Sequence, residues 1–374
     1  MSSTRYEWPL DDDLADVLRD GSSAADRDRR LPPASVDALD AGGLLRLCLP
    51  REFGGPGITP MDVVAAISAV SRIDGAAGWC SMISSTTCAL AGFLPDEVAM
   101  ATFGSGRAFG GVFVPNGRFE AVGNETLLTG RWQWGSGLHH CDYIVAGAVG
   151  VEGERRTFVL PAGAVMIEDT WHTVGMRGSG SVDFAVNRLP VDIAHSVAQV
   201  RPEVVTTDPI SRFPNFALLA SSVAAVAAGI AEHAFDEVLA LVGARAPQFS
   251  SKVLAEHTGV QASMSRRRVE LDAASRFLED LIAQMWELTL RGVRPGLSER
   301  VALRSGAAHL AAVSKNVVDA LFSIAGGAAV YESSDLGRCL RDVHVVNQHI
   351  MVADRLHESL GRHLVGLPLD DGMI

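Results

Sequence analysis

The sequence is poor in several features that would each identify a class of protein. Its five cysteines are scattered from Cys48 to Cys339 and form no Cys-x-x-Cys pair. This usage is typical of buried thiols in a reducing compartment, so we expect a cytoplasmic protein without a disulfide framework. The first residues are acidic and lack the apolar core of a signal peptide.

Positive charge is scarce as well. The 32 lysines and arginines are outnumbered by 44 aspartates and glutamates, which gives a formal net charge of −12. Binding to nucleic acid or to an anionic membrane depends on Lys and Arg neutralising phosphates. The composition therefore argues against both partners, and it carries no information about a small-molecule substrate.

Long apolar runs are also missing. The most apolar stretch, residues 217–231, falls short of the roughly 20 residues that a membrane span needs. It is rich in alanine and ends at Glu232 and His233, so we expect a buried helix of a helical bundle and no membrane attachment.

Common cofactor and catalytic motifs are absent too. The sequence contains no Walker loop, no His-Glu-x-x-His, no EF-hand loop and no Gly-x-Ser-x-Gly elbow. The glycine pair that begins at Gly104 lacks a surrounding βαβ unit, so no Rossmann site is expected. His139 and His140 would point to opposite faces of a strand, and His344 and His349 would lie about 140° apart on a helix. No metal centre is predicted.

What is present is a change of pattern along the chain. A helical pattern is followed by short strands between Gly, Asn and Asp turns, and then by long apolar stripes of helical period. Breaks near residues 243–247, 292–296 and 326–327 divide the last region into about four antiparallel helices. We therefore predict a mainly α fold with an N-terminal helical domain (1–104), a middle β-barrel or sandwich (105–212) and a C-terminal four-helix bundle (213–374).

Three segments within this framework have an unusual composition. Residues 175–184, GMRGSGSVDF, are too rich in glycine for an ordinary strand and form either a flexible hairpin or part of a site. Arg341-Asp342 precedes His344 and His349 on the last predicted long helix, where a lone histidine is more often a core or surface residue than a catalyst. Residues 131–147, RWQWGSGLHHCDYIVAG, carry two tryptophans that form either hydrophobic core or a wall for a flat cofactor.

Taken in order, four segments resemble the acyl-CoA dehydrogenase superfamily over nearly the whole chain. They are residues 41–57 (AGGLLRLCLPREFGGPG), residues 71–79 (SRIDGAAGW), residues 175–183 (GMRGSGSVD), and Gly326-Gly327 with residues 338–342 (RCLRD). The resemblance implies a flavin enzyme with an acyl-CoA dehydrogenase-like fold, usually a homotetramer. The same domain order was reached above from the pattern alone.

Two departures from the family pattern indicate a branch. The dehydrogenases remove an α-proton with a glutamate, often eight residues after the aspartate of the Arg-Asp pair, and here that position is Ile350. An aliphatic side chain cannot accept a proton. His349, in contrast, resembles a histidine of the two-component flavin monooxygenases that share this fold, and residues 131–143 resemble their Trp…Ser-Gly…His block, with Tyr143 where tryptophan is commoner.

This resemblance implies an oxygen-inserting enzyme. It would take reduced FMN or FAD, with FMN favoured, from a separate NAD(P)H-dependent flavin reductase. Reaction with O₂ would give a C4a-hydroperoxyflavin whose distal oxygen passes to an aromatic, phenolic or polyketide-like small molecule.

The resemblance also implies contacts with the flavin ring. Because side chains alternate along a strand, Trp132 and Trp134 would face the same side and lie against the ring. Ser136 and the backbone of Gly137, in a turn, would offer hydrogen bonds to flavin N5 and O4.

Further residues take roles by the same resemblance. His349 would be the base for an acidic substrate proton, since its unperturbed pKa of about 6.5 is close to working pH, and His139 would contact the substrate. Arg245 and Phe249 map onto a flavin-binding segment that usually reaches a neighbouring subunit's cofactor. Gly326-Gly327 belong to the C-terminal cofactor-binding region.

Three other functions stay open at this point. The same oxygen chemistry on an amine or amino sugar would give a hydroxylamine or nitroso product. A relocated base would restore an acyl-CoA dehydrogenase. A non-catalytic homologue of the same fold would bind flavin or serve a structural role only.

Overall fold

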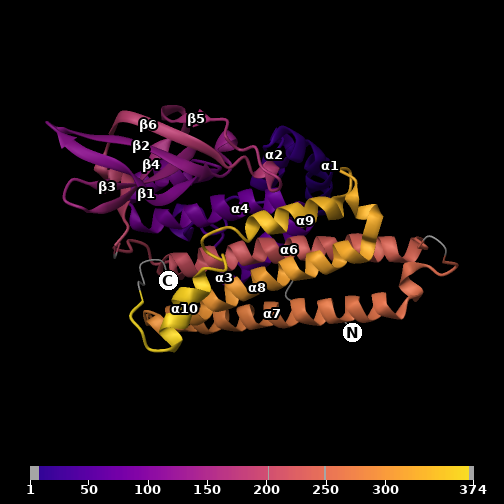
Figure 1. Cartoon of the computed structure of the whole chain (residues 1–374). Helices are drawn as coiled ribbons and strands as arrows, with labels where there is room; N and C mark the ends of the chain where they lie inside the picture. The colour runs from indigo at the N-terminus through magenta and orange to yellow at the C-terminus, as the bar shows by residue number, and fades with distance from the viewer. Residues whose placement is uncertain (1–7, 201, 248–249, 370–374) are drawn as a thin grey trace.

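The structure is a computed structural model that describes residues 8–200, 202–247 and 250–369. Helices, strands and again helices follow one another along the chain, and the strands gather in one layer beside a long bundle of helices (Figure 1). This arrangement confirms the predicted fold class. The domain limits at residues 104 and 212 stay predictions.

The N-terminal region is helical and its helices begin at well-formed caps. Asp11 accepts hydrogen bonds from two N–H groups at the start of the first helix, and Thr59 with Asp62 forms a capping box. These side chains satisfy donors that a helix start leaves without partners. The helices are α1 (Asp12–Asp28), α2 (Pro33–Ala41), α3 (Pro60–Ile73), α4 (Gly75–Cys88) and α5 (Asp96–Ala99).

The middle region forms one seven-stranded sheet in the order β5-β6-β2-β1-β3-β4-β7. Only the β1–β3 pair among the described strands is parallel, and the other pairs are antiparallel. The strands are β1 (Phe109–Val122), β2 (Glu125–Gly135), β3 (Tyr143–Gly150), β4 (Arg155–Pro161), β5 (Met166–Glu168), β6 (Val182–Val191) and β7 (Ser196–Ala198). The sequence pattern predicts strands near residues 107–114, 126–134, 142–149, 155–161 and 181–191, and these coincide with β1, β2, β3, β4 and β6. The three-residue strands β5 and β7 are too short to have been expected.

The C-terminal region is the predicted helical bundle. Its long helices end near the three sequence breaks, and the turns between α6 and α7 and between α8 and α9 lie at the end of the bundle away from the sheet (Figure 1). The helices are α6 (Asn215–Ala244), α7 (Thr258–Leu290), α8 (Leu297–Ala325), α9 (Asp335–Val346) and α10 (Leu356–Leu364).

Helix α6 is the central element of the core, and it packs against α3, α4, α8 and α9. Small residues allow this close packing: a Cβ at Gly229 would lie 2.4 Å from the carbonyl oxygen of Ser68 in α3. Residues 215–244 and 297–330 are long and apolar enough to cross a membrane by length and composition alone. The apolar window of the first is 83% buried inside the protein, as expected for a core helix.

Candidate active site

Ser136 lies at the point where β2 ends and the chain turns toward β3. Its neighbour Gly137 has a φ of +70°, which a residue with a side chain rarely adopts, and the short 3-10 helix η4 (Leu138–His140) follows. The Gly137 N–H stabilises this turn by donating a hydrogen bond to the carbonyl oxygen of Ser179 at 2.8 Å. The Ser136 side chain is buried.

Trp79 of α4 contacts both Ser136 and His349. Its indole Nε1 donates to Ser136 Oγ at 2.9 Å. Its ring meets the His349 ring edge to face, with centroids 5.3 Å apart and planes at 79°. Two residues that sequence analysis placed in one site, more than 200 positions apart, are therefore joined through a third residue. Trp79 closes the family-like segment at residues 71–79, but nothing in the sequence pattern predicted a role for it.

His349 does not lie on a helix, which corrects the expectation from sequence. Helix α9 ends at Val346, and His349 occupies the turn that follows, where the Met351 N–H approaches its Nδ1 at 3.4 Å. Burial, reinforced by the nearby Arg304 guanidinium, lowers the pKa of His349 to about 4. The imidazole is therefore neutral near pH 7 and a weaker base than an unperturbed histidine. Because Nδ1 accepts the Met351 N–H, Nε2 carries the ring proton and can only donate a hydrogen bond.

Behind Ser136 lies a loop formed by the glycine-rich segment. The 3-10 helix η6 (Arg177–Ser179) lies between Met176 and Gly180, both with left-handed φ. Three hydroxyls run from this loop to the turn: Ser179 Oγ is 2.8 Å from Ser181 Oγ, and Ser181 Oγ is 2.8 Å from Ser136 Oγ. The segment is a buried, hydrogen-bonded loop, so the flexible-hairpin alternative is wrong.

Asp342, of the Arg-Asp pair in α9, holds this loop against the bundle. Its Oδ1 accepts a short hydrogen bond from the Met176 N–H. A Cβ at Gly175 would lie 2.4 Å from the backbone carbonyl of Arg341, so loop and helix touch backbone to backbone. Burial raises the pKa of Asp342 to about 7, with the Asp74 carboxylate adding to the effect and the Met176 N–H opposing it.

The two tryptophans of residues 131–147 do not share a face, and the expectation of a common wall is wrong. The pairing of β2 with β6 slips between Trp132 and Gly135, and Trp134 adopts a φ of +68° within this irregularity. An extra residue in one strand reverses the side to which the following side chains point. Trp132 is 0% exposed and Trp134 is 69% exposed.

Trp132 belongs to the core of the sheet. Its ring stacks on Phe184 at 5.0 Å, and its Nε1 donates to the carbonyl oxygen of Gly147 at 2.8 Å. It fills the space that Gly117 and Gly130 leave, since a Cβ at either would lie within 2.5 Å of the indole. The core interpretation holds for Trp132, and only Trp134 is free to contact a ligand.

His139 and His140 lie together on η4, beside the Gly137 turn. Burial, followed by the Arg30 charge, lowers the pKa of His139, and burial lowers the pKa of His140 to about 4. His139 is the more exposed of the two, and a Cβ at Gly180 would lie 3.2 Å from its ring. A substrate contact by His139 stays a prediction.

The remaining predicted flavin contacts lie elsewhere in the chain. Arg245 ends α6, and Gly326, with φ +56°, ends α8 with Gly327 beyond it, all at the bundle end away from the sheet (Figure 1). Phe249 lies outside the described residues. Contacts from these positions to the Ser136 region would have to come from another subunit, as the resemblance implies.

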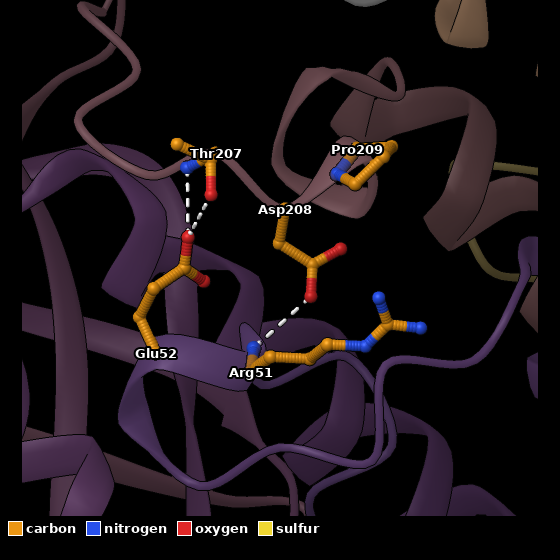
Figure 2. A pocket seen from close by; sticks show the side chains of 5 residues that line it. All are labelled: Arg51, Glu52, Thr207, Asp208 and Pro209. Carbon is orange, nitrogen blue, oxygen red and sulfur yellow. Dashed lines mark hydrogen bonds between the residues drawn. The ribbon is translucent and has the colours of Figure 1, made fainter.

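A polar cavity of about 380 Å³ lies between the 3-10 helices η1 (Arg51–Phe53) and η8 (Pro209–Arg212) (Figure 2). Its lining groups bond to one another: Glu52 Oε1 accepts from the N–H and hydroxyl of Thr207, and Asp208 accepts from the Arg51 N–H. These bonds tie the N-terminal region to the segment that enters α6. We interpret the cavity as a space within the contact between the N-terminal region and the segment that leads into α6, and not as a ligand site.

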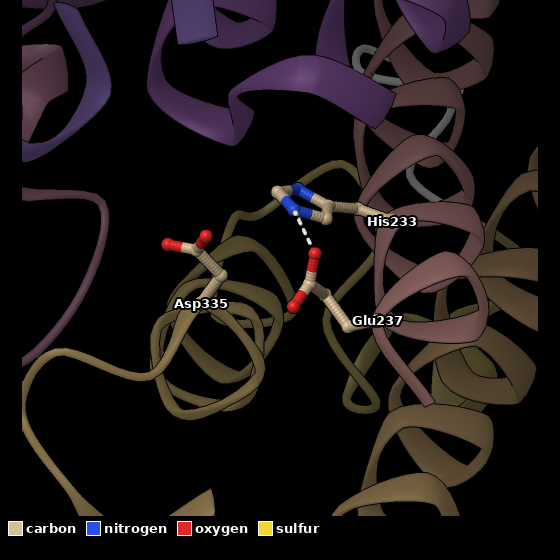
Figure 3. Close-up of side chains that lie close together, drawn as sticks. All are labelled: His233, Glu237 and Asp335. Atoms are coloured by element: carbon tan, nitrogen blue, oxygen red, sulfur yellow. Dashed lines mark ion pairs between the residues drawn. The ribbon is translucent and has the colours of Figure 1, made fainter. Parts of the chain in front are cut away.

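His233, Glu237 and Asp335 form a group whose ligand atoms all lie within 4.8 Å of one another (Figure 3). His233 Nε2 is 3.8 Å from Glu237 Oε1, and Asp335 already pairs with the Arg338 guanidinium at 2.9 Å. With a guanidinium beside it, the group is better described as an ion-pair network between α6 and α9 than as a metal site.

Comparison with known proteins agrees with this geometry. The family model "Acyl-CoA dehydrogenase, C-terminal domain" matches residues 221–354, and the model "Acyl-CoA dehydrogenase, N-terminal domain" matches residues 12–98. An indole-3-acetate monooxygenase of Pseudomonas putida is 29% identical, over 98% of this chain and 95% of that protein. The oxygenase subunit HsaA of a flavin-dependent monooxygenase from Rhodococcus jostii (strain RHA1) is 24% identical, over 97% of this chain and 99% of that protein.

Among solved structures, XiaF from Streptomyces sp., in complex with FADH2 and glycerol, has the same fold. The TM-score is 0.88 at 24% sequence identity, with 96% of this chain and 94% of that chain covered. The two family models together match more than half of the chain. The two relatives, one named a monooxygenase and the other the oxygenase subunit of a flavin-dependent monooxygenase, align over nearly its full length. The chain belongs to the acyl-CoA dehydrogenase superfamily, in the branch of two-component flavin-dependent monooxygenases.

Proposed function

We propose that this protein is the oxygenase component that hydroxylates an aromatic small molecule at the cluster of Ser136, Trp79 and His349. The observation that carries the proposal is the pair of contacts by which Trp79 joins Ser136 to His349. A relative that acts on indole-3-acetate supports an aromatic substrate.

The residues around Ser136 fit the edge of a flavin ring. The Trp79 N–H occupies one hydrogen-bonding position of Ser136 Oγ and the contact with Ser181 occupies another, so one position of this hydroxyl is left for a ligand. Gly137 has no side chain to obstruct a ring, and a Cβ there would meet the His140 ring at 3.0 Å, but its N–H already donates to the Ser179 carbonyl oxygen and is not available to flavin O4. The exposed indole of Trp134 is available to lie against a flat ring.

Reduced flavin, when bound, would supply the two electrons that activate O₂, which provides the oxygen atom that is transferred. The residues of this chain bind, orient and exclude water. Ser136 would hold flavin N5, and the buried apolar surroundings of Trp79 would limit access of water to the reacting atoms. His349, neutral near pH 7 with Nδ1 bonded to the Met351 N–H, would donate its Nε2 proton to the oxygen of a phenol and so orient the ring to be hydroxylated.

The partners follow from the branch. The relative named as an oxygenase subunit implies a separate reductase that delivers reduced flavin. FMN and FAD share the ring that Ser136 would contact, so titration with both flavins decides between them. We further propose a homotetramer in which Arg245 and Gly326-Gly327 approach the cofactor of a neighbouring subunit.

A dehydrogenase with a relocated base finds less support. The buried carboxylates of this region already have structural partners, because Asp74 caps α4 and Asp342 accepts the Met176 N–H. Ile350, at the usual position of the base, is an exposed aliphatic side chain.

One experiment tests the proposed function. Reduced FMN or FAD is mixed anaerobically with the protein, then with oxygenated buffer containing indole-3-acetate, resorcinol or 4-hydroxyphenylacetate. We expect delayed return of oxidised-flavin absorbance and one ¹⁸O atom from ¹⁸O₂ in a hydroxylated product. Immediate reoxidation without product for every aromatic compound, or turnover of an acyl-CoA with an artificial electron acceptor, would refute the proposal. Oxygenation of an amino sugar instead would redirect it to nitrogen.

A further inference from the structure

The hydroxyls of Ser136, Ser181 and Ser179 form a continuous hydrogen-bonded row with defined ends. All three side chains are buried. At one end Ser179 Oγ is 2.7 Å from the carbonyl oxygen of Met176, and at the other end the Trp79 indole N–H approaches Ser136 Oγ at 2.9 Å. Both ends carry a group with only one possible role, because a carbonyl oxygen only accepts and an indole N–H only donates.

These ends fix the direction of every bond in the row. Two oxygens 2.7 Å apart need a proton between them, so Ser179 donates its single hydroxyl proton to the Met176 carbonyl. Ser181 must then donate to Ser179, because Ser179 has no second proton. By the same argument Ser136 must donate to Ser181.

These bond directions determine what Ser136 can offer to a ligand. Its own proton is committed to Ser181, and one of its two acceptor positions takes the Trp79 N–H. What it can offer to a ligand is its remaining acceptor position and no donor. Ser136 therefore matches a ligand atom that carries hydrogen.

We propose that the row Ser136–Ser181–Ser179 makes Ser136 an obligatory hydrogen-bond acceptor, so that the site selects reduced flavin, whose N5 carries hydrogen, over oxidised flavin, whose N5 carries a lone pair. The inference rests on the proposed function, which places flavin N5 at Ser136. Ser179 and Ser181 are positioning residues, because they act on the flavin only through Ser136.

The expected size of this selection follows from the cost of a mismatched polar contact. A buried acceptor that faces another acceptor forfeits the bond and its solvation, which corresponds to roughly a tenfold to hundredfold ratio of dissociation constants. A tenfold change in this ratio corresponds to about 30 mV in the two-electron midpoint potential of bound flavin relative to free flavin.

The test is a pair of anaerobic titrations. The full-length protein is titrated with oxidised and with dithionite-reduced FMN and FAD, followed by tryptophan fluorescence, and the ratio of the two dissociation constants is compared among variants. The variants are Ser136→Ala, Ser181→Ala and Ser179→Ala, with Ser314→Ala as control. Ser314 is an equally buried hydroxyl in α8 that donates to its own helix at the carbonyl of Leu310. Circular dichroism and melting temperature establish that each variant is folded.

Ser181→Ala frees the Ser136 proton to point at N5, and Ser179→Ala allows both remaining hydroxyls to reverse. Each should lower the selectivity for reduced flavin about tenfold, mainly through tighter binding of oxidised flavin, while Ser314→Ala leaves it unchanged. If Ser136→Ala binds reduced flavin like the wild type, the placement of flavin at Ser136, and with it the proposed function, is wrong. If Ser136→Ala weakens binding but the folded Ser181→Ala and Ser179→Ala variants keep the wild-type ratio, the directional row is overturned.

Discussion

At the scale of single residues, the chemistry available to His349 is set by what encloses it. Burial and the Arg304 charge disfavour the imidazolium, so the ring is uncharged at any pH at which the enzyme would work. The unperturbed pKa assumed from sequence suggested a base, because the sequence does not show which residues will enclose a side chain. Neutrality changes the expected role from removing a proton to donating a hydrogen bond from Nε2, since Nδ1 already accepts the Met351 N–H.

A pH profile distinguishes these roles. His349→Ala should lower the yield of product per O₂ consumed about tenfold, the size expected for one lost hydrogen bond in a buried site. With a pKa of about 4, His349 does not titrate between pH 5.5 and 8. The ratio of wild-type to variant yield should therefore be constant over this range. A change in product yield near pH 6.5 that only the wild type shows would instead indicate that His349 acts as a base.

Trp79 permits an equally local test. Trp79→Phe keeps the ring beside His349 but removes the N–H that Ser136 accepts, so the free energy of unfolding should fall by about 1–3 kcal/mol. Urea denaturation measures the change, and Trp286→Phe, which alters a ring packed against Phe213, is the control. Product yield should fall in Trp79→Phe only. Equal effects of the two substitutions would mean that Trp79 is ordinary core.

At the scale of elements, the critical contact is the one between the η6 loop and α9. Sequence analysis recognised both segments by resemblance but could not show that they touch. It also missed the slip between β2 and β6, because a bulge is defined by the partner strand as much as by the strand that carries it. Alternation along one strand therefore failed to predict that Trp132 and Trp134 point to opposite sides.

Gly175 tests the contact directly. In Gly175→Ala the new Cβ would lie 2.4 Å from backbone atoms of Arg341, which cannot move without shifting α9. Overpacking of this kind costs typically about 1–3 kcal/mol, and more where backbone must shift. Gly163→Ala, where nothing lies within 4 Å of the new Cβ, should change the free energy of unfolding by less than about 0.5 kcal/mol. Matching denaturation curves for both variants would contradict the contact.

Because Asp342 lies in this contact, the free energy of unfolding should depend on pH. Its pKa in the folded protein, about 7, lies above its usual 3.8, so between these values the folded chain keeps a proton that the unfolded chain has lost. The stabilisation from this proton is complete below pH 3.8 and is lost as the pH rises through 7. Wild type should therefore lose stability relative to Asp342→Asn between pH 5 and pH 7.5 in urea titrations. A difference that is independent of pH would show that Asp342 is ionised throughout.

At the scale of the whole molecule, domain order and the bundle could be predicted because hydrophobic period and chain breaks are local properties of sequence. The candidate site could be predicted only in part, since Ser136, Trp79 and His349 come from three regions and meet only after the domains pack. Position-by-position roles came from resemblance alone; the structure places Trp132 in the core of the sheet, and the role of Ser136 stays a prediction.

The predicted homotetramer is a property of the whole surface. Helix α7 exposes Val269, Phe277 and Leu290, large apolar side chains on one long helix. Burying such side chains between subunits removes apolar area from water. Phe277→Glu should therefore reduce the mass measured by light scattering, whereas Val151→Glu, on an exposed turn of the β region, should not. A monomeric wild type would refute the assembly.

All five cysteines are buried, and burial raises the pKa of each thiol for which a shift is resolved: Cys48, Cys80, Cys88, Cys141 and Cys339. Only a thiolate reacts readily with peroxide. An oxygenase that fails to transfer its oxygen releases hydrogen peroxide within its own interior, and a protein with accessible thiolates would be inactivated by its own failed turnovers. Because the sulfurs of this chain are enclosed and protonated, they should resist oxidation by this peroxide. A cysteine introduced at an exposed position would then be the one reactive thiol, to which a probe can be attached.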